Sequence, residues 1–495
     1  MVSKGRDRAE HPLAAVATWG ARPSWLTPAR ARLLAAMSAL SLVKILVARR
    51  LELLPVEAYS WMWSRHPQLG YFDHPAMTSW MVRASTTLVG HSFVGVRLLA
   101  VASSIGAAWF AFLALRRMYD ERTAEHVSLL VMLLPITSVV GAEAAPDSPV
   151  LLFWSATLWA FVRAIADGGT RSWLLAGLFL GLAMDSKYHG ALLAIGLLLF
   201  LALSREQRGW LARREPYLAA LVALAAFSPT LIWNAQHGFK SFLYQGERIG
   251  GQPFTLRELL NFLLTQLLLL TPIVFAQAWA SGIRGLRSWR DGAWQERLLV
   301  AISMSTLLLF LAVAFFRPLR ANWLAPGYLG VIALAGAAAV RSEGWGLRLQ
   351  QATLATLAAG YVAVAVAVQV APASWFTSWA QLAREVSLAH PDFVIASDYH
   401  IASELGYTNP RIPSFDLAPL GRPSKSFADW WRPLEFSGGH AVLVFDPKKP
   451  RLVRETLKLA RRSFDRVDEP RRVTVTRLGG RVRSFTLVDA WGYRP

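Results

Sequence analysis

Ionisable side chains gather where the long apolar runs of this sequence end. Such side chains are costly at membrane depth and usually serve a function there. The set holds both carboxylates and cations, which together suit one chemistry: the cations would hold a phosphate leaving group, and a carboxylate would take the proton of an acceptor hydroxyl. The members are Glu57, Asp73, His74, Asp147, Lys187, His189, His237, Arg248, Arg317 and Arg320.

Composition places these residues in a membrane protein. Of the 495 residues, 54% are hydrophobic and 17% are charged, whereas soluble domains have about 25% charged residues. Apolar runs long enough to cross about 30 Å of hydrocarbon recur through most of the chain. They predict a mostly α, polytopic protein of about 11 to 13 membrane helices, with eleven segments read at residues 31–49, 94–115, 123–142, 150–166, 172–184, 187–203, 217–233, 258–281, 297–316, 323–340 and 350–371.

The placement of Lys and Arg predicts the orientation. Most of the net charge of +20 comes from arginines in short loops on one side, which the positive-inside rule makes cytoplasmic. Residues 1–30 then form a cytoplasmic tail, and the opposite loops face outward. Charge in such loops fits anionic head groups better than nucleic acid. The absence of Cys excludes disulfides, thiolate catalysis and Cys-ligated zinc. The first thirty residues show no signal-peptide pattern, so the first helix is expected to act as its own targeting signal.

The outward segments carry the candidate chemistry. The first, residues 50–93, predicts two short interfacial helices, within a transmembrane region of residues 31–371. Charged residues become frequent again after residue 371, and the pattern of residues 372–495 predicts a small soluble α/β domain. Its expected strands are FVIAS, HAVLVFD, RRVTVTRL and RVRSFTLVDA, with LVRETLKLARR as a helix.

Five ordered blocks resemble a known family, the polyprenyl-phosphate-sugar-dependent glycosyltransferases of the GT-C fold. The blocks are PVEAYSWMWSRHPQLGYFDHPAM, APDSPVLLFW, LAMDSKYHGALL, SPTLIWNAQHGFKSFLYQ and RANWLAPGYL. The nearest relatives implied are bacterial aminoarabinose and galacturonic acid transferases of lipopolysaccharide, followed by protein O-mannosyltransferases.

The resemblance implies Glu57 and Asp73 as catalytic residues. The family often has Asp immediately before this Glu, but Val56 stands there, so either Glu57 or Asp73 must supply the base. As alternatives, Glu57 is a charge stabilised at a helix N-terminus and Asp73 is a capping residue. His74 lies near the donor phosphate in the family pattern.

The same blocks imply a wider set of substrate-binding residues. Lys187 interrupts an apolar hairpin and suits a phosphate partner, with a snorkelling lysine as the alternative. Asp147 either contacts the sugar or caps the following helix. Asp73 and His237 together are half of a possible divalent metal site, the only cofactor expected. The full set of substrate-binding residues is Tyr59, His74, Asp147, Lys187, Tyr188, Asn234, His237, Arg317, Arg320 and Asn322.

The resemblance therefore implies transfer of a sugar, with inversion, from a polyprenyl phosphate to an envelope acceptor such as lipid A or lipopolysaccharide. The expected partners are this donor, a lipid or glycan acceptor and membrane lipids. The expected location is the bacterial inner membrane, with the active site and the C-terminal domain periplasmic. The alternatives are a protein O-mannosyltransferase and a lipid-sugar transporter or flippase, although the sequence has no internal repeat of the kind common in transporters.

Overall fold

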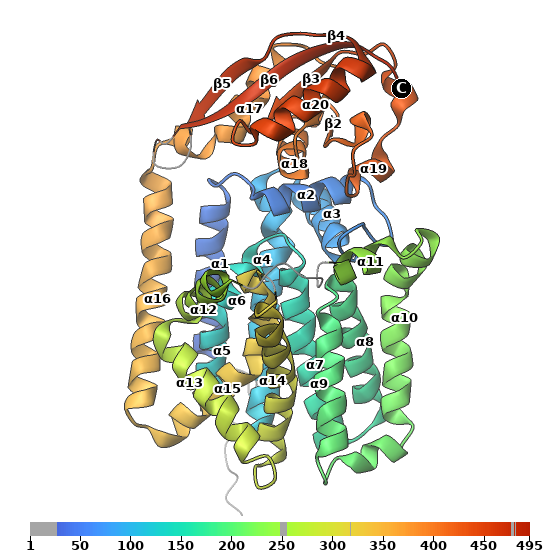
Figure 1. Ribbon diagram of the computed structural model, residues 1–495. Coiled ribbons are helices and arrows are strands. Elements are labelled where there is room, and N and C mark those ends of the chain that lie inside the picture. Colours follow the sequence, from blue (N-terminus) through green and yellow to red (C-terminus); the bar gives the residue numbers. More distant parts are fainter. Residues whose placement is uncertain (1–26, 248–254, 317, 477–479, 481) are drawn as a thin grey trace, which may run out of the picture.

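The computed structural model describes residues 27–247, 255–316, 318–476, 480 and 482–495. Helices run side by side along the molecule, and a smaller domain with a sheet lies over one end of them (Figure 1). The helical bundle ends with α16 (Trp345–Val370), and α17 (Ser378–Ser387) begins the C-terminal domain. The fold is mostly α, as the sequence predicts.

All eleven segments predicted to span the membrane are helical. They correspond to α1 (Pro28–Ala48), α4 (Phe93–Met118), α5 (Glu121–Leu133) with α6 (Pro135–Ser138), α7 (Asp147–Asp167), α8 (Thr170–Ser186), α9 (Gly190–Leu203), α10 (Glu215–Gln236), α12 (Leu256–Leu270) with α13 (Pro272–Arg287), α14 (Trp294–Ala314), α15 (Ala325–Ser342) and α16. By length and composition, seven of the described helices can cross a membrane, or up to nine if each bent pair is one span. Helices α8 and α9 are shorter, with 17 and 14 residues.

Two predicted spans are bent, a feature that their apolar pattern does not predict. The pair over Glu121–Ala142 bends by 68°, and the pair α12 and α13 bends by 103°. In both cases a proline begins the second helix, and the residue before a proline is disfavoured in the helical conformation. Leu134 accordingly has ψ 132°, and Thr271 has φ 65° and ψ 148°.

Helices α8 and α10 pack closely against each other, which fixes where the end of α8 lies relative to the end of α10. A Cβ on Gly177 would lie 2.1 Å from the Ala219 carbonyl oxygen, and one on Gly181 would lie 2.3 Å from that of Ala223. Small residues allow such backbone approach between membrane helices. The turn that follows α8 is thereby held beside the end of α10.

The first outer segment forms two short helices, as predicted: α2 (Pro55–Arg65) and α3 (Met77–Val89). Between them a tight turn is closed by a bridge between Gly70 and Pro75 and by the Tyr71 N–H, which donates to the His74 carbonyl over 2.9 Å. This turn contains the Asp-His-Pro motif.

The C-terminal domain is a six-stranded sheet with helices. Its strand order is β2-β1-β3-β6-β4, and β5 also pairs with β6. The strands are β1 (Phe393–Ala396), β2 (Ser414–Phe415), β3 (Ala441–Phe445), β4 (Phe464–Val467), β5 (Arg471–Thr476) and β6 (Val482–Tyr493), and the helices after α17 are α18 (Tyr399–Thr408), α19 (Phe427–Trp430) and α20 (Pro450–Ser463). The four strands and the helix read from the sequence correspond to β1, β3, β5, β6 and α20.

The C-terminal domain contacts the first outer segment directly. Helix α18 packs on α2, where a Cβ on Gly406 would lie 2.8 Å from Met62 Sδ. Glu52, just before α2, accepts hydrogen bonds from the Ser378 hydroxyl and the Trp379 N–H, each over 2.8 Å. A carboxylate at the start of α17 satisfies N–H groups that a helix leaves unpaired. These contacts fix the domain over the end of the bundle that carries the Asp-His-Pro turn.

Candidate active site

A cavity of about 640 Å³ lies between the end of the bundle and the C-terminal domain. It is enclosed by α2, the turn after it, the loop before α7, the turn between α8 and α9, α11 (Lys240–Glu247), the segment before α15 and the C-terminal domain. Eight of the twelve residues predicted for the site line it: Tyr59, Asp73, His74, Asp147, Lys187, Tyr188, Arg320 and Asn322. A cavity of about 610 Å³ beside α4 contains none of them.

The Asp-His-Pro turn places a carboxylate and an imidazole on the cavity wall. Asp73 Oδ2 pairs with Lys425 Nζ at 2.7 Å, and the Tyr59 hydroxyl lies 3.5 Å from Asp73 Oδ1. His74 Nδ1 is buried and has no hydrogen-bond partner among the described residues. Burial lowers the pKa of His74 to about 4, because the charged ring loses its hydration. His74 is therefore a neutral donor or acceptor at neutral pH, whereas the family pattern predicts a basic group here.

A second ion pair lies across the cavity. Lys187 Nζ contacts Asp147 Oδ1 at 2.7 Å, and Asn322 Nδ2 donates to Asp147 Oδ2 over 2.9 Å. Asp147 is the first residue of α7, where the helix dipole favours a negative charge. Lys187 directly follows α8 with an extended backbone, and its side chain lines the cavity. Three segments distant in sequence thus meet at one charged group.

Two predicted binding residues, Asn234 and His237, do not line the cavity. The Asn234 amide donates to the Thr230 carbonyl over 3.0 Å, and its oxygen accepts from the Phe242 N–H over 3.3 Å. His237 bonds to the Trp233 carbonyl through Nδ1 over 2.8 Å and stacks on the Trp233 ring. Their positions at the end of α10 connect this helix to α11. Tyr188 lines the cavity and donates or accepts with Ser241 over 2.6 Å.

This geometry bears on the metal site expected from Asp73 and His237. Asp73 is engaged by Lys425, and His237 faces Trp233. Among the residues that the structure describes, no group of three or more His, Asp or Glu side chains could hold a metal ion. Of this pair only Asp73 lines the cavity, so a divalent metal stays a prediction without geometric support.

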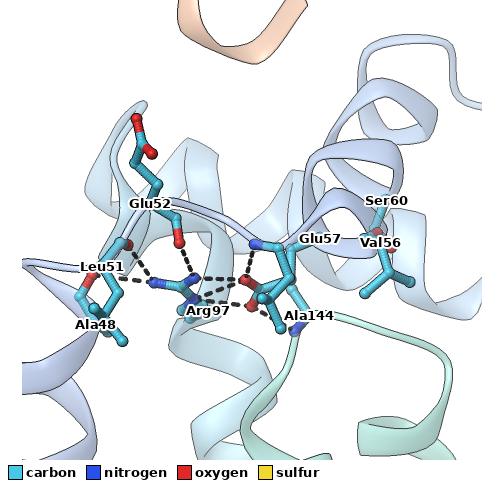
Figure 2. A network of polar contacts seen from close by, with 9 residues as sticks. Ala48, Leu51, Glu52, Val56, Glu57, Ser60, Arg97 and Ala144 are labelled. Atoms are coloured by element: carbon cyan, nitrogen blue, oxygen red, sulfur yellow. Dashed lines mark hydrogen bonds and ion pairs between the residues drawn. The ribbon is translucent and has the colours of Figure 1, made fainter. Parts of the chain in front are cut away.

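Glu57, the other predicted catalytic residue, lies outside the cavity lining. Its carboxylate forms an ion pair with Arg97 at 2.5 Å and accepts from the Leu54 N–H over 2.8 Å and the Ala144 N–H over 3.2 Å. Figure 2 shows Arg97 between this carboxylate and the carbonyl groups of Ala48, Leu51 and Glu52. Val56 lines the cavity in its place. Adjacent helix residues point about 100° apart, which explains why Val56 faces inward and Glu57 does not.

The arginines predicted for the site are described in part. Arg317 and Arg248 lie outside the described residues. Arg320 is exposed at the cavity, and no carboxylate of the described chain lies within ion-pair distance of it. It therefore remains available to an anion from outside.

Several lining residues were not anticipated from the sequence. Lys425 and Tyr399 come from the C-terminal domain, and Lys425 Nζ lies 3.9 Å from the centre of the Tyr399 ring. Glu143 lines the cavity from the loop before α7. Only Glu143 had a visible signal, since it lies two residues before the block APDSPVLLFW. The positions of Lys425 and Tyr399 follow from domain packing, which the spacing of residues along the chain does not encode.

The chain is similar in sequence to known transferases. Residues 73–233 match the family described as dolichyl-phosphate-mannose-protein mannosyltransferase. The lipid A galacturonosyltransferase RgtD of Rhizobium johnstonii is 28% identical over 283 residues, which is 56% of this chain and 59% of that protein. The lipopolysaccharide core galacturonosyltransferase RgtA of the same organism is 26% identical over 409 residues, 77% of this chain and 80% of that protein. The first alignment thus spans less than two thirds of its relative.

A solved structure has the same fold over almost the whole chain. ArnT from Cupriavidus metallidurans, bound to undecaprenyl phosphate, aligns with a TM-score of 0.61 and 15% identity. The alignment covers 92% of this chain and 97% of that one. The likeness confirms the predicted fold class, including the helical bundle and the C-terminal domain.

Proposed function

We propose that this chain, a multi-pass membrane protein with the GT-C glycosyltransferase fold, transfers a sugar from a polyprenyl phosphate to lipid A or lipopolysaccharide. The observation that carries the proposal is one cavity at the bundle end in which carboxylates and cations face each other. Support comes from relatives named for lipid A and lipopolysaccharide core. The structural relative is bound to undecaprenyl phosphate.

The donor phosphate binds on the side of the cavity that carries Lys187 and Arg320. The Lys187 ammonium has three donors, of which one contacts Asp147. His74, neutral and with a buried unpartnered nitrogen, donates one N–H to a phosphate oxygen. The start of the lipid chain packs against the apolar side chains of Val140 and Leu269 in the lining.

The reaction is a single inverting displacement. The acceptor oxygen attacks the anomeric carbon while the bond from this carbon to the phosphate oxygen breaks, and the cations stabilise the charge of the leaving phosphate. A carboxylate takes the acceptor proton. Of the two carboxylates predicted for this role, Asp73 faces the cavity, whereas Glu57 is held by Arg97 outside it.

We propose further that the cavity and the C-terminal domain face the periplasm at the bacterial inner membrane. The support is charge: Arg116 and Arg117 lie in the last turn of α4, and Arg284 and Arg287 lie in the last turn of α13. Both helices end on the side of the bundle away from the C-terminal domain (Figure 1). Basic loop residues favour the cytoplasmic side. Of the tail of residues 1–30, expected to be cytoplasmic, residues 1–26 lie outside the described residues, and α1 begins at Pro28.

A protein hydroxyl is the second candidate acceptor, because the family matched over residues 73–233 is described as a protein mannosyltransferase. A transporter has less support. Its charges would lie near the bilayer midplane, whereas Asp73 and Lys187 lie at one end of the bundle, in a cavity that the C-terminal domain also lines.

Turnover of the donor tests the proposal. The protein in lipid nanodiscs is incubated with a panel of polyprenyl-phosphate sugars, with lipid A, core lipopolysaccharide or a Ser/Thr peptide as acceptor. Released polyprenyl phosphate and modified acceptor are measured by mass spectrometry. We expect release that depends on lipid A or lipopolysaccharide and on Lys187. Peptide modification alone would favour the second acceptor, and no release from any donor would contradict transfer.

A further inference from the structure

Glu143 is a carboxylate of the cavity that has no assigned role. It stands in the loop before α7, four residues before Asp147, and its side chain is half-buried. No ion pair or side-chain hydrogen bond joins it to another described residue, whereas Asp73 and Asp147 each hold a lysine. Among the acidic residues of the described cavity lining, Glu143 is thus the one whose proton-accepting oxygens are not occupied by a cation.

The position of Glu143 makes it reachable from two sides. A groove of about 270 Å³ runs between α1, α4 and α16, with the exposed side chains of Leu54, Val139 and Val364 at its rim. Glu143 is the residue common to the linings described for this groove and for the cavity. A group that enters from the groove side meets the Glu143 carboxylate where the cavity begins.

The backbone around Glu143 is fixed by the buried ion pair of α2. The next residue, Ala144, donates its N–H to Glu57 Oε1 over 3.2 Å, and Arg97 holds the same carboxylate (Figure 2). The Ala145 N–H donates to the Glu143 carbonyl over 2.8 Å, which closes a turn. Glu57 is therefore a positioning residue for the loop, which gives it a role although it lies outside the cavity.

We propose that Glu143 is the general base that takes the proton of the acceptor hydroxyl. This inference rests on the proposed sugar transfer. As the acceptor oxygen forms its bond to the anomeric carbon, its proton passes to a Glu143 carboxylate oxygen. The bond from the anomeric carbon to the phosphate oxygen breaks, and polyprenyl phosphate leaves with the electron pair. Asp73 then serves to hold Lys425 at the donor.

The surroundings of Glu143 suit a base near neutral pH. Burial, together with the negative charges of Glu57 and Asp147, raises the pKa of Glu143 to about 7, while Arg97 opposes this rise. A base whose pKa lies near the working pH combines a large ionised fraction with a strong proton affinity. The other ionisable groups that line the groove beside it are Lys44, Glu52 and Tyr361.

The test compares four proteins: wild type, Glu143→Gln, Glu143→Asp and, as the matched control, Glu469→Gln in the exposed segment between β4 and β5. Each is assayed in nanodiscs for kcat between pH 5.5 and 9, and binding of undecaprenyl phosphate is measured separately. We expect Glu143→Gln to lower kcat by about 100-fold or more, since positioned general bases contribute about 10² to 10⁴. Its affinity for undecaprenyl phosphate should stay within about twofold. Glu143→Asp should retain intermediate activity.

The pH profile separates a base from a structural residue. The carboxyl is protonated below its pKa and cannot accept a proton, so wild-type kcat should rise with pH through about 7. Residual activity of Glu143→Gln should lack this rise. If Glu143→Gln kept the kcat of wild type and the same rise of kcat with pH, Glu143 would not be the base, although the sugar transfer would stand. The same conclusion would follow if Glu143→Gln lost affinity for undecaprenyl phosphate by as large a factor as it lost kcat. A wild type inactive with every donor would overturn the sugar transfer and this inference with it.

Discussion

The two predicted catalytic carboxylates of the first outer segment, Glu57 and Asp73, are both buried, yet the structure uses them differently. Glu57 pairs with Arg97, and their side chains are 1% and 10% exposed; Asp73 pairs with Lys425, at 5% and 21%. Arg97 also donates hydrogen bonds to three backbone carbonyls, whereas Lys425 faces the cavity beside the Tyr399 ring. An ion pair with every donor used inside the protein fixes the fold. In an ion pair on a cavity wall, by contrast, either side chain can leave its partner and bind a substrate.

The largest effect expected from this contrast is on stability. Arg97→Met leaves the Glu57 carboxylate buried without a cation, which typically costs about 3–5 kcal/mol. We expect a strongly lowered midpoint of thermal unfolding in nanodiscs, partly restored in the double variant Arg97→Met with Glu57→Gln. Arg454→Met, on the exposed face of α20, is the control. A single variant as stable as wild type would show that the pair does not fix the fold.

The next effect is on catalysis. Lys187→Met removes a cation that lies in the cavity beside Asp147, and removal of one charge-stabilising donor lowers turnover by about 10²- to 10³-fold. Steady-state release of polyprenyl phosphate measures it. Lys240→Met, which changes a half-exposed lysine of α11 outside the cavity lining, should stay near wild type. Equal activity of the two variants would remove Lys187 from the donor site.

The smallest effect is expected at the C-terminal domain. Lys425→Met should raise the KM for donor about tenfold, because a charge-assisted hydrogen bond contributes about 1.5–3 kcal/mol, while kcat changes little. Lys449→Met, at an exposed pair with Asp398, is the matched control. A fall in kcat at unchanged KM would place Lys425 in the chemical step instead of donor binding.

The pattern of apolar runs was sufficient for much of this protein. It located all eleven helical segments, the two short helices of the first outer segment, and four strands of the C-terminal domain, because hydrophobic periodicity is a local property. It did not locate the bends at Pro135 and Pro272. A proline permits several conformations in a membrane helix, and the neighbouring helices select among them.

The site was predictable where a motif carried it. Asp73, His74, Asp147 and Lys187 lie in ordered blocks, and all four line the cavity. Asn234 and His237 belong to such a block too, but Asn234 connects α10 to α11 and His237 bonds to Trp233 within α10. A block fixes the order of residue types along the chain, whereas the direction of each side chain depends on contacts made by other segments.

By itself, then, the sequence determined a polytopic helical protein with charged residues at the helix ends. In lipid, backbone N–H and C=O groups must be hydrogen-bonded within the protein, and long apolar segments achieve this as helices. Tertiary structure decided which of those charges meet. The rotation of α2 about its own axis directs Val56 into the cavity and Glu57 toward Arg97. Docking of the C-terminal domain brings Lys425 to Asp73 across 352 residues of chain. Neither result follows from spacing, since both depend on how separate elements pack.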